Sequence, residues 1–359
     1  MKTILCLAAP ASRRYAPVMG ELGHRSGFGW PLRPDRVWRE QTPEEQGISS
    51  GRTTNGDSCH HHDARADGAQ GLAQLLLLGA IWGGSFFFAR IAVAELPPLV
   101  LVLFRVTIAA AALQLYLAVR GPSFRLALPH AGLFFLLALA NNVIPFSLIF
   151  AGQTELGAGV ASVLNSTTPF WTLILANALT SDEKLSWNKL AGIALGIAGT
   201  AVMIGPGLVA GLGGPVWAKF ALIGASLSYA VALMIARRFK GVPSPVIATG
   251  QLTCSTIIMI PVVLFTYRTA NLFSASPPVW AAVLALALLS TAFAYILYFN
   301  LVASAGATNA SLVTLIVPAS AILLGFLFLG ERLELFELGG MALIALGLVT
   351  IDGRLFGRR

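Results

Sequence analysis

ASLVTLIVPASAILLGFLFLGERL, residues 310–333, is an apolar run long enough to cross a bilayer, with a proline near its middle and a Gly-Glu-Arg ending. A weaker copy, ASVLNSTTPFWTLILANALTSDEKL, occupies residues 161–185, and its Pro169 aligns with Pro318. Both prolines are predicted kinks, because proline removes a helical hydrogen bond. A duplicated apolar helix with a duplicated proline indicates that the chain consists of two related halves.

The correspondence between the halves extends beyond these two runs. Matching residues are separated by 147 or 149 positions: Trp82 with Tyr229, Arg90 with Arg237, Phe150 with Phe299, and Gly157 with Gly306. A nearly constant offset through several helices predicts a duplicated unit of five helices. Because five is an odd number, the two units must be inverted in the membrane, which is the layout of many secondary transporters.

The composition is that of a membrane protein. Hydrophobic residues make up 56% of the 359 residues and charged residues 11%, whereas soluble domains are about one quarter charged. Since lipid cannot hydrogen-bond bare backbone groups, the apolar runs are expected to be helices. Ten runs lie near 73–92, 97–118, 130–150, 157–179, 189–207, 217–237, 245–266, 279–301, 308–329 and 335–353. The sequence therefore predicts an all-α membrane protein with ten transmembrane helices arranged as two inverted five-helix repeats.

Four parts of the chain follow from these runs. They are a disordered N-terminal tail over residues 1–70, a first repeat over 71–208, a second repeat over 215–354, and a basic C-terminal tail over 355–359. The N-terminal tail has no sustained apolar periodicity, and an alternative is that translation starts downstream of it. The three cysteines have no metal-ligand spacing, and we expect no metal site and no cofactor.

Lysine and arginine residues predict the orientation of the chain. With a cytoplasmic N-terminus, the inside segments carry ten of these residues and the outside segments three, or four if Arg90 is included. We therefore expect both termini in the cytoplasm and the protein in the plasma (inner) membrane. These loops also account for the net charge of +8. The expected partners are the lipid bilayer and a small-molecule substrate, with no nucleic acid.

Several motifs resemble one transporter family. LGAIWGGSFFFARIAV (residues 78–93), the Pro97-Pro98 pair followed by Arg105, and the two proline-to-glutamate runs are similar to the EamA type of the drug/metabolite transporter superfamily. The resemblance covers about residues 73–352 and implies the fold rather than the substrate, since the family exports amino acids, other metabolites and drugs. The first copy departs from the usual ending and reads Thr-Ser-Asp-Glu-Lys at residues 180–184.

Acidic residues lie only near the ends of the predicted spans. A carboxylate proton relay at the midplane therefore has no obvious carrier. Facilitated transport, exchange, and proton coupling through a boundary acid such as Glu155 remain open. The same distribution provides no catalytic residues for a membrane-embedded enzyme. We interpret the ending Gly330-Glu331-Arg332 as a boundary and topology feature.

Arg105 is the most unusual residue within a predicted span, because an arginine there costs about 2.5–3.5 kcal/mol to insert. Its guanidinium would suit a substrate carboxylate. The alternative is a structural arginine whose side chain reaches the interface or bonds helix-end carbonyls. The resemblance favours this alternative, since it places an arginine here in transporters of varied substrates.

Polar residues precede the prolines. Asn165 lies four residues before Pro169, and its repeat equivalent Thr314 lies four residues before Pro318. Asn141 lies in the third run, where Asn141 and Asn142 align with Ser290 and Thr291 of the second half. We predict that Asn141, Asn165 and Thr314 line a substrate path near the midplane. The hydroxyls between Asn165 and Pro169 could instead satisfy carbonyl groups freed by the kink.

Aromatic residues with a polar atom could line a cavity for amphipathic organic substrates. The candidates are Trp82, Trp171, Tyr229 and Tyr295. Trp82 and Tyr229 are repeat equivalents, and they lie on the helices that bracket the pocket in the resembled fold. Packing in the bundle or placement at the membrane interface is the alternative for each of them.

Glycines recur on the fifth and tenth runs at Gly192, Gly199, Gly340 and Gly347. Such residues allow close helix approach, and we expect packing within the bundle rather than a dimer interface; the protein is predicted to be a monomer or homodimer. The predicted function is export of small metabolites or drugs by alternating access. The alternatives are a non-transporting scaffold or sensor and, with less support, a membrane-embedded enzyme.

Overall fold

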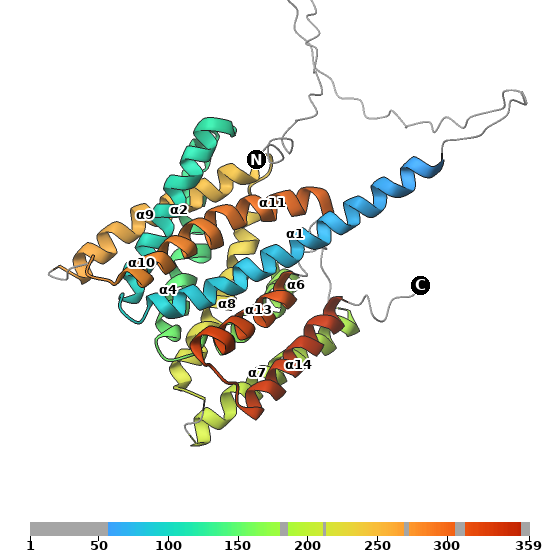
Figure 1. Ribbon diagram of the computed structural model, residues 1–359, viewed down its shortest axis with the longest axis vertical. Helices are drawn as coiled ribbons and strands as arrows, with labels where there is room; N and C mark the ends of the chain where they lie inside the picture. The colour runs from blue at the N-terminus through green and yellow to red at the C-terminus, as the bar shows by residue number, and fades with distance from the viewer. Residues whose placement is uncertain (1–56, 180–185, 211–212, 269–272, 306–312, 353–359) are drawn as a thin grey trace, which may run out of the picture. The chain divides into compact units, whose positions relative to one another are not determined.

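The computed structural model describes residues 57–179, 186–210, 213–268, 273–305 and 313–352 (Figure 1). The helices in chain order are α1 (Asp57–Ala92), α2 (Pro98–Arg120), the 3-10 helix η1 (Phe124–His130), α3 (Ala131–Ala138), the π-helix η2 (Leu139–Val143), α4 (Ile144–Gln153), α5 (Ala158–Asn165), α6 (Thr168–Leu179), α7 (Trp187–Ala210), α8 (Val216–Ala236), α9 (Ser244–Thr266), α10 (Pro277–Leu284), the π-helix η3 (Ala285–Phe293), α11 (Ala294–Ala305), α13 (Val313–Leu329) and α14 (Leu335–Asp352). The end of the first copy (180–185), Gly306 and residues 310–312 lie outside the described residues.

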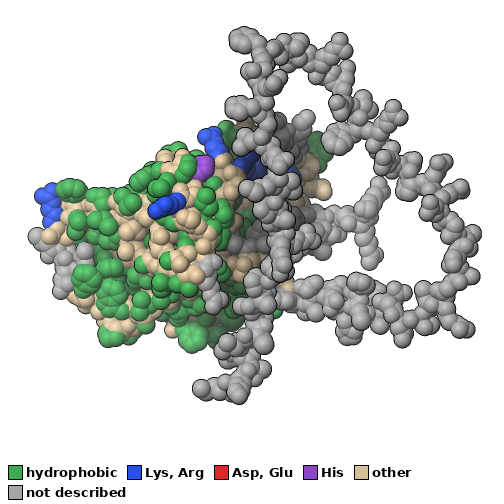
Figure 2. All heavy atoms as spheres, turned by 90° about the horizontal axis from the view of Figure 1, so that it is seen from above, with side chains coloured by type: hydrophobic (Ala, Val, Ile, Leu, Met, Phe, Trp, Pro, Cys, Tyr) green, Lys and Arg blue, Asp and Glu red, His purple; other side chains and the backbone are tan. Residues whose placement is uncertain are grey.

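The regular secondary structure of the described residues is entirely helical, with no strand among them, as predicted. Within it, seven helical segments are long and apolar enough to cross a membrane: 71–92, 98–119, 124–153, 187–204, 216–236, 244–266 and 277–298. Shorter apolar helices cover 316–329 and 335–351. The protein is therefore a multi-pass membrane protein. Figure 2 shows a face made largely of hydrophobic side chains, with Lys and Arg side chains confined to a few places.

Two of the predicted runs contain π-helical segments that the sequence analysis did not anticipate. The third run contains η2, and the eighth contains η3. Shifted by the repeat offset of 149, η2 corresponds to residues 288–292, which lie inside η3. Pro145, just after η2, has no N–H to donate to the preceding turn. Both halves therefore carry a wide helical turn at the equivalent place, a feature often associated with functional sites.

The fourth run is interrupted at its proline. α5 ends at Asn165 and α6 begins at Thr168, with Pro169 in the first turn of α6. The side-chain hydroxyls of Ser166 and Thr167 each donate to a carbonyl three residues earlier, at 2.7 Å. The carbonyl that Pro169 cannot bond, that of Asn165 four residues earlier, accepts instead from the hydroxyls of Thr168 and Ser226. Pro318, by contrast, lies inside the continuous helix α13, so the two aligned prolines occupy different local structures.

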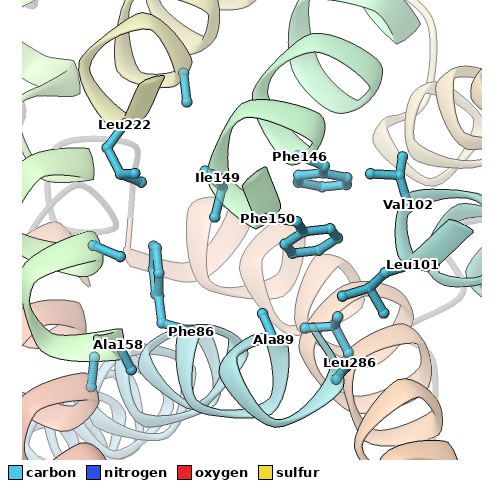
Figure 3. Packing of buried hydrophobic residues seen from close by; sticks show 14 of the residues in the cluster. Phe86, Ala89, Leu101, Val102, Phe146, Ile149, Phe150, Ala158, Leu222 and Leu286 are labelled. Atoms are coloured by element: carbon cyan, nitrogen blue, oxygen red, sulfur yellow. The ribbon is translucent and has the colours of Figure 1, made fainter. Parts of the chain in front are cut away.

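The largest cluster of buried hydrophobic residues draws on most of the helices, and part of it lies between α2 and α4. Figure 3 shows the rings of Phe146 and Phe150 on α4 directed toward Leu101 and Val102 on α2. The two rings are stacked, with centroids 6.2 Å apart. All four side chains are buried. This packing holds the middle of α2 in a fixed position, and Arg105 is on the same helix.

Helices α7 and α14 lie side by side (Figure 1) because their glycines let the two backbones approach. A Cβ atom at Gly199 would lie 2.6 Å from the carbonyl oxygen of Gly340, and one at Gly192 would lie 2.6 Å from that of Gly347. Both distances are too short for a van der Waals contact. The prediction that this glycine set packs within the bundle is confirmed.

Replacing Gly340 by alanine is expected to destabilise the protein by about 1–3 kcal/mol, because the added methyl group overpacks a backbone contact. The new Cβ would lie 2.7 Å from the Gly199 carbonyl oxygen. Thermal unfolding of the solubilised protein measures the loss. The neighbouring substitution Gly339→Ala is the control, since nothing lies within 4 Å of a Cβ there. Equal stability of the two variants would refute the close approach of α7 and α14.

Candidate functional site

A network of polar side chains connects the two halves of the chain in the middle of the bundle. Asn141, in η2, donates through Nδ2 to Gln251 Oε1 on α9 at 2.8 Å and to the hydroxyl of Tyr295 on α11 at 3.4 Å. Next to it, Asn142 donates to Ser255 on α9 at 3.0 Å. The wide turn of η2 thus places two amides of the first half against side chains of the second.

Arg105 lies beside this network and is buried, with 6% of its surface exposed. Its Nε donates to the Thr291 hydroxyl in η3 at 3.0 Å. Its guanidinium carbon lies 3.8 Å from the centroid of the Phe146 ring, a cation–π arrangement. The phenol groups of Tyr229 on α8 and Tyr295 on α11 lie near it. Among the described residues, the hydrogen-bond acceptor of Arg105 is the Thr291 side chain, and no helix-end carbonyl accepts from it.

The break between α5 and α6 presents two polar atoms without partners. Asn165 Oδ1 and Trp171 Nε1 are buried, and neither has a hydrogen-bond partner among the described residues. One is an acceptor and the other a donor. Leaving such groups unpaired costs free energy, and a ligand that supplied both a donor and an acceptor would remove that cost. The backbone carbonyl of Asn165, in contrast, accepts from Thr168 and Ser226.

Trp82 on α1 packs against the ring of Tyr298 on α11, with centroids 5.5 Å apart. Both side chains are only partly buried and flank a small cluster of buried residues from α1, α11 and α13. Thr314, near the start of α13, is also partly buried. Tyr298 lies one helical turn after Tyr295 on α11, so the Trp82–Tyr298 pair is next to the Arg105 group.

A charged cavity of about 920 Å³ lies at the end of the bundle where α1 meets α2 and α13 meets α14. Its lining includes Arg90, Glu95, Glu155, Glu331 and Glu337. Glu95 accepts from the hydroxyl and the backbone N–H of Ser276, each at 2.6 Å. The bond from the Ser276 hydroxyl, followed by that from its backbone, holds the pKa of the Glu95 carboxyl below its usual value.

Glu331 makes a second contact between the halves at this cavity. Its carboxylate accepts from the backbone N–H groups of Ala158 at 2.9 Å and Gly159 at 3.3 Å. These are the first residues of α5, whose N-cap position is Gly157 and offers no side chain. Glu331 therefore serves as the cap of a helix in the other half. The interpretation of this residue as only a boundary feature was incomplete.

Among the predicted site residues, the structure brings together Arg105, Asn141, Tyr229 and Tyr295. Trp82 packs against Tyr298, one turn from Tyr295, and Asn165 and Trp171 carry the two unpartnered atoms at the break between α5 and α6. Sequence reasoning did not include Gln251 and Thr291 among the site residues. The available signals were the amide inside an apolar run, for Gln251, and the alignment with Asn142, for Thr291.

Comparison with known proteins gives a consistent match over both halves. The model of the EamA-like transporter family matches residues 69–205 and again residues 216–351. A known crystal structure aligns with a TM-score of 0.58 and 19% identity, covering 81% of this chain and 98% of its own. At that identity the likeness shows the fold alone.

Three curated relatives have names that refer to transport. The uncharacterized inner membrane transporter YedA of Escherichia coli (strain K12) is 30% identical over 79% of this chain and 91% of its own. A probable terminal-alkyne amino-acid exporter of Streptantibioticus cattleyicolor is 27% identical over 79% of this chain and 94% of its own. A probable amino-acid metabolite efflux pump of Salmonella typhimurium is 26% identical over 76% of this chain and 91% of its own.

Proposed function

The chain belongs to the EamA-like transporter family, and from this membership we propose that it exports small organic metabolites, amino acids or related compounds, across the inner membrane. Two relatives named for the export of amino acids or their metabolites support this substrate class. The proposed mechanism is alternating access, in which two five-helix units move around a central site. No catalytic role is proposed for any residue.

The observation that carries this proposal is the hydrogen-bonded network between the halves. Asn141 belongs to the first half, while Gln251 and Tyr295 belong to the second. A substrate bound there would touch both units, so motion of one against the other could open the site to either side. We propose that the substrate-binding residues are Trp82, Arg105, Asn141, Asn165, Trp171, Tyr229, Tyr295 and Thr314, and that the chain bends at Pro169 and Pro318.

The finer architecture is part of the proposal. Ten membrane helices would form two inverted repeats over residues 71–208 and 215–354, between a tail at 1–70 and another at 355–359. The two family matches, over 69–205 and 216–351, support these boundaries. The excess of Lys and Arg in alternate connections supports cytoplasmic termini. The charged cavity would then face outward.

Cysteine labelling tests the orientation. Glu334 is exposed in the connection between α13 and α14. In a Glu334→Cys variant, a membrane-impermeant maleimide should label the introduced cysteine from outside in right-side-out vesicles. Labelling that requires permeabilisation would reverse the proposed orientation.

Substrate exchange tests the function. The purified full chain would be reconstituted in liposomes that contain an unlabelled compound, and uptake of the labelled compound measured for amino acids, sugars and cationic drugs. We expect saturable exchange of at least one amino acid or related metabolite, well above that of protein-free liposomes. If no compound moved faster than through protein-free liposomes, the proposal of transport at this site would fail and a scaffold or sensor would become the better hypothesis.

A further inference from the structure

Arg105 is held inside the bundle at a distance from either end of its helix. It lies seven residues after Pro98, the first residue of α2, which corresponds to roughly 10 Å along the helix axis. The α2 backbone there is fixed by the packing of Leu101 and Val102, which are fully buried. The guanidinium is therefore presented at one place, between α4 and η3, instead of reaching toward water.

The hydrogen bonding of Arg105 uses little of its capacity. A guanidinium has five N–H donors, and the acceptor recorded for it among the described residues is the Thr291 hydroxyl. Thr291 in turn donates to the carbonyl of Leu286, five residues earlier in the π-helix η3, at 2.9 Å. Because that bond uses the hydroxyl hydrogen, the Thr291 oxygen is turned to accept from Nε. This leaves the two terminal nitrogens of the guanidinium to bind something else.

The charge of Arg105 also has no carboxylate partner. Among the described residues, the titratable groups near it are the phenols of Tyr229 and Tyr295, which are neutral at physiological pH, and no carboxylate is among them. A buried cation without a counter-ion is unfavourable, and arginines at membrane depth are normally paired or line a water-filled path. Stacking on the Phe146 ring compensates for only part of that cost. The site therefore holds a positive charge for which a bound anion would supply the counter-ion.

We propose that Arg105 anchors the carboxylate group of the transported substrate, with Tyr229 and Tyr295 beside it and Thr291 positioning the guanidinium. This inference rests on the proposed transport function and names the substrate class of that site. A carboxylate matches the paired donors on the terminal edge of a guanidinium. Arg105 belongs to the first half and the two tyrosines to the second, so an anchored carboxylate would touch both halves.

The single positive charge of Arg105 favours a substrate group that carries one negative charge. One guanidinium compensates one carboxylate, whereas a dianionic phosphate would bring a second negative charge into a site where the described residues provide no second cation beside Arg105. Monoanionic and zwitterionic organic acids fit this condition. Cationic drugs do not, because two positive charges would then face each other at low dielectric.

The test compares each acid with its amide in liposomes containing the purified full chain. The probes are labelled alanine, leucine and phenylalanine and the corresponding alaninamide, leucinamide and phenylalaninamide. We expect the wild type to exchange the preferred acid about 10- to 100-fold better than its amide, the range expected for a charge-assisted pair. In Arg105→Gln that ratio should fall to about one, and in Arg105→Lys the KM for the acid alone should rise about tenfold.

A purely structural arginine would lower exchange of acid and amide equally, so the acid-to-amide ratio separates the two roles. Thermal unfolding and size-exclusion chromatography check that each variant is folded. If Arg105→Gln does not fold, the selective KM increase in Arg105→Lys decides the question. A ratio unchanged in the folded variants, or a wild type that prefers the amide, would overturn the anchor while leaving transport intact. Failure of the wild type to exchange any probe, sugar or cationic drug would overturn both.

Discussion

Replacement of Glu337 by alanine is expected to lower the free energy of unfolding by about 3–5 kcal/mol, which is typical when one partner of a buried charge pair is removed. Lys219 on α8 is fully buried, and Glu337 on α14 is 4% exposed. A Cβ at Gly213 would lie 3.0 Å from Glu337 Oε1 and 3.1 Å from Lys219 Nζ, so the two charged groups are close together. Lys219 Nζ also donates to the Met203 carbonyl on α7 at 2.9 Å. Without the Glu337 carboxylate, the lysine charge stays buried and loses its counter-ion.

The double variant Lys219→Met/Glu337→Ala tests this explanation. Removing both charges should recover a large part of the stability lost in Glu337→Ala, because the residual cost comes from the stranded lysine. Glu334→Ala is the matched control, since Glu334 is exposed three residues away and should change stability by less than about 0.5 kcal/mol. A loss that is the same in Glu337→Ala and in Glu334→Ala would contradict the buried pair.

The second large effect is expected for Glu331→Ala, with a loss of about 2–4 kcal/mol. The substitution removes the cap of α5, worth about 1–2 kcal/mol, and leaves two backbone N–H groups without their acceptor. Glycines make room for this carboxylate: a Cβ at Gly157 would lie 2.8 Å from it. A Cβ at Gly325 would come closer still.

Glu331→Gln should fall between the wild type and Glu331→Ala, because an amide oxygen can still accept from Ala158 but carries no charge to interact with the helix dipole. Thermal unfolding of the solubilised variants gives the order. If Glu331→Gln and Glu331→Ala were both as stable as the wild type, the cap that Glu331 provides for α5 would be absent in solution.

The fold class could be read from the sequence because lipid imposes strict rules on it. Long apolar runs in a chain with few charges can only be helices. The repeated apolar run with its proline predicted a duplication, and the family model matches the chain twice, once in each half. The π-helical segments could not be predicted in the same way. They depend on tertiary contacts, such as the bond from Arg105 to Thr291, which joins residues 186 positions apart.

For the candidate site, the sequence indicated which polar residues to consider better than it indicated which of them contact one another. Arg105, Asn141 and Tyr295 were identified because polar groups in apolar runs are costly. Sequence alone could not show that Asn141 donates to Tyr295 while Asn165 Oδ1 has no hydrogen-bond partner among the described residues. Glu331 was read as a boundary because its partner, Ala158, lies 173 residues away. Contacts of that range are set by the packing of whole helices.

The central claim is that the polar network between the two halves is the transport site. The most direct test compares substrate exchange in liposomes by the Asn141→Ala variant with exchange by the Gln114→Ala variant. Both amides donate to a side chain on α9, Asn141 to Gln251 at 2.8 Å and Gln114 to Thr253 at 3.1 Å. Only Asn141 also bonds Tyr295 beside Arg105. With both variants folded, we expect Asn141→Ala to lose exchange by at least about tenfold and Gln114→Ala by less than about twofold. If the Asn141→Ala variant exchanged substrate as fast as the wild type, the network between the halves would not be the transport site.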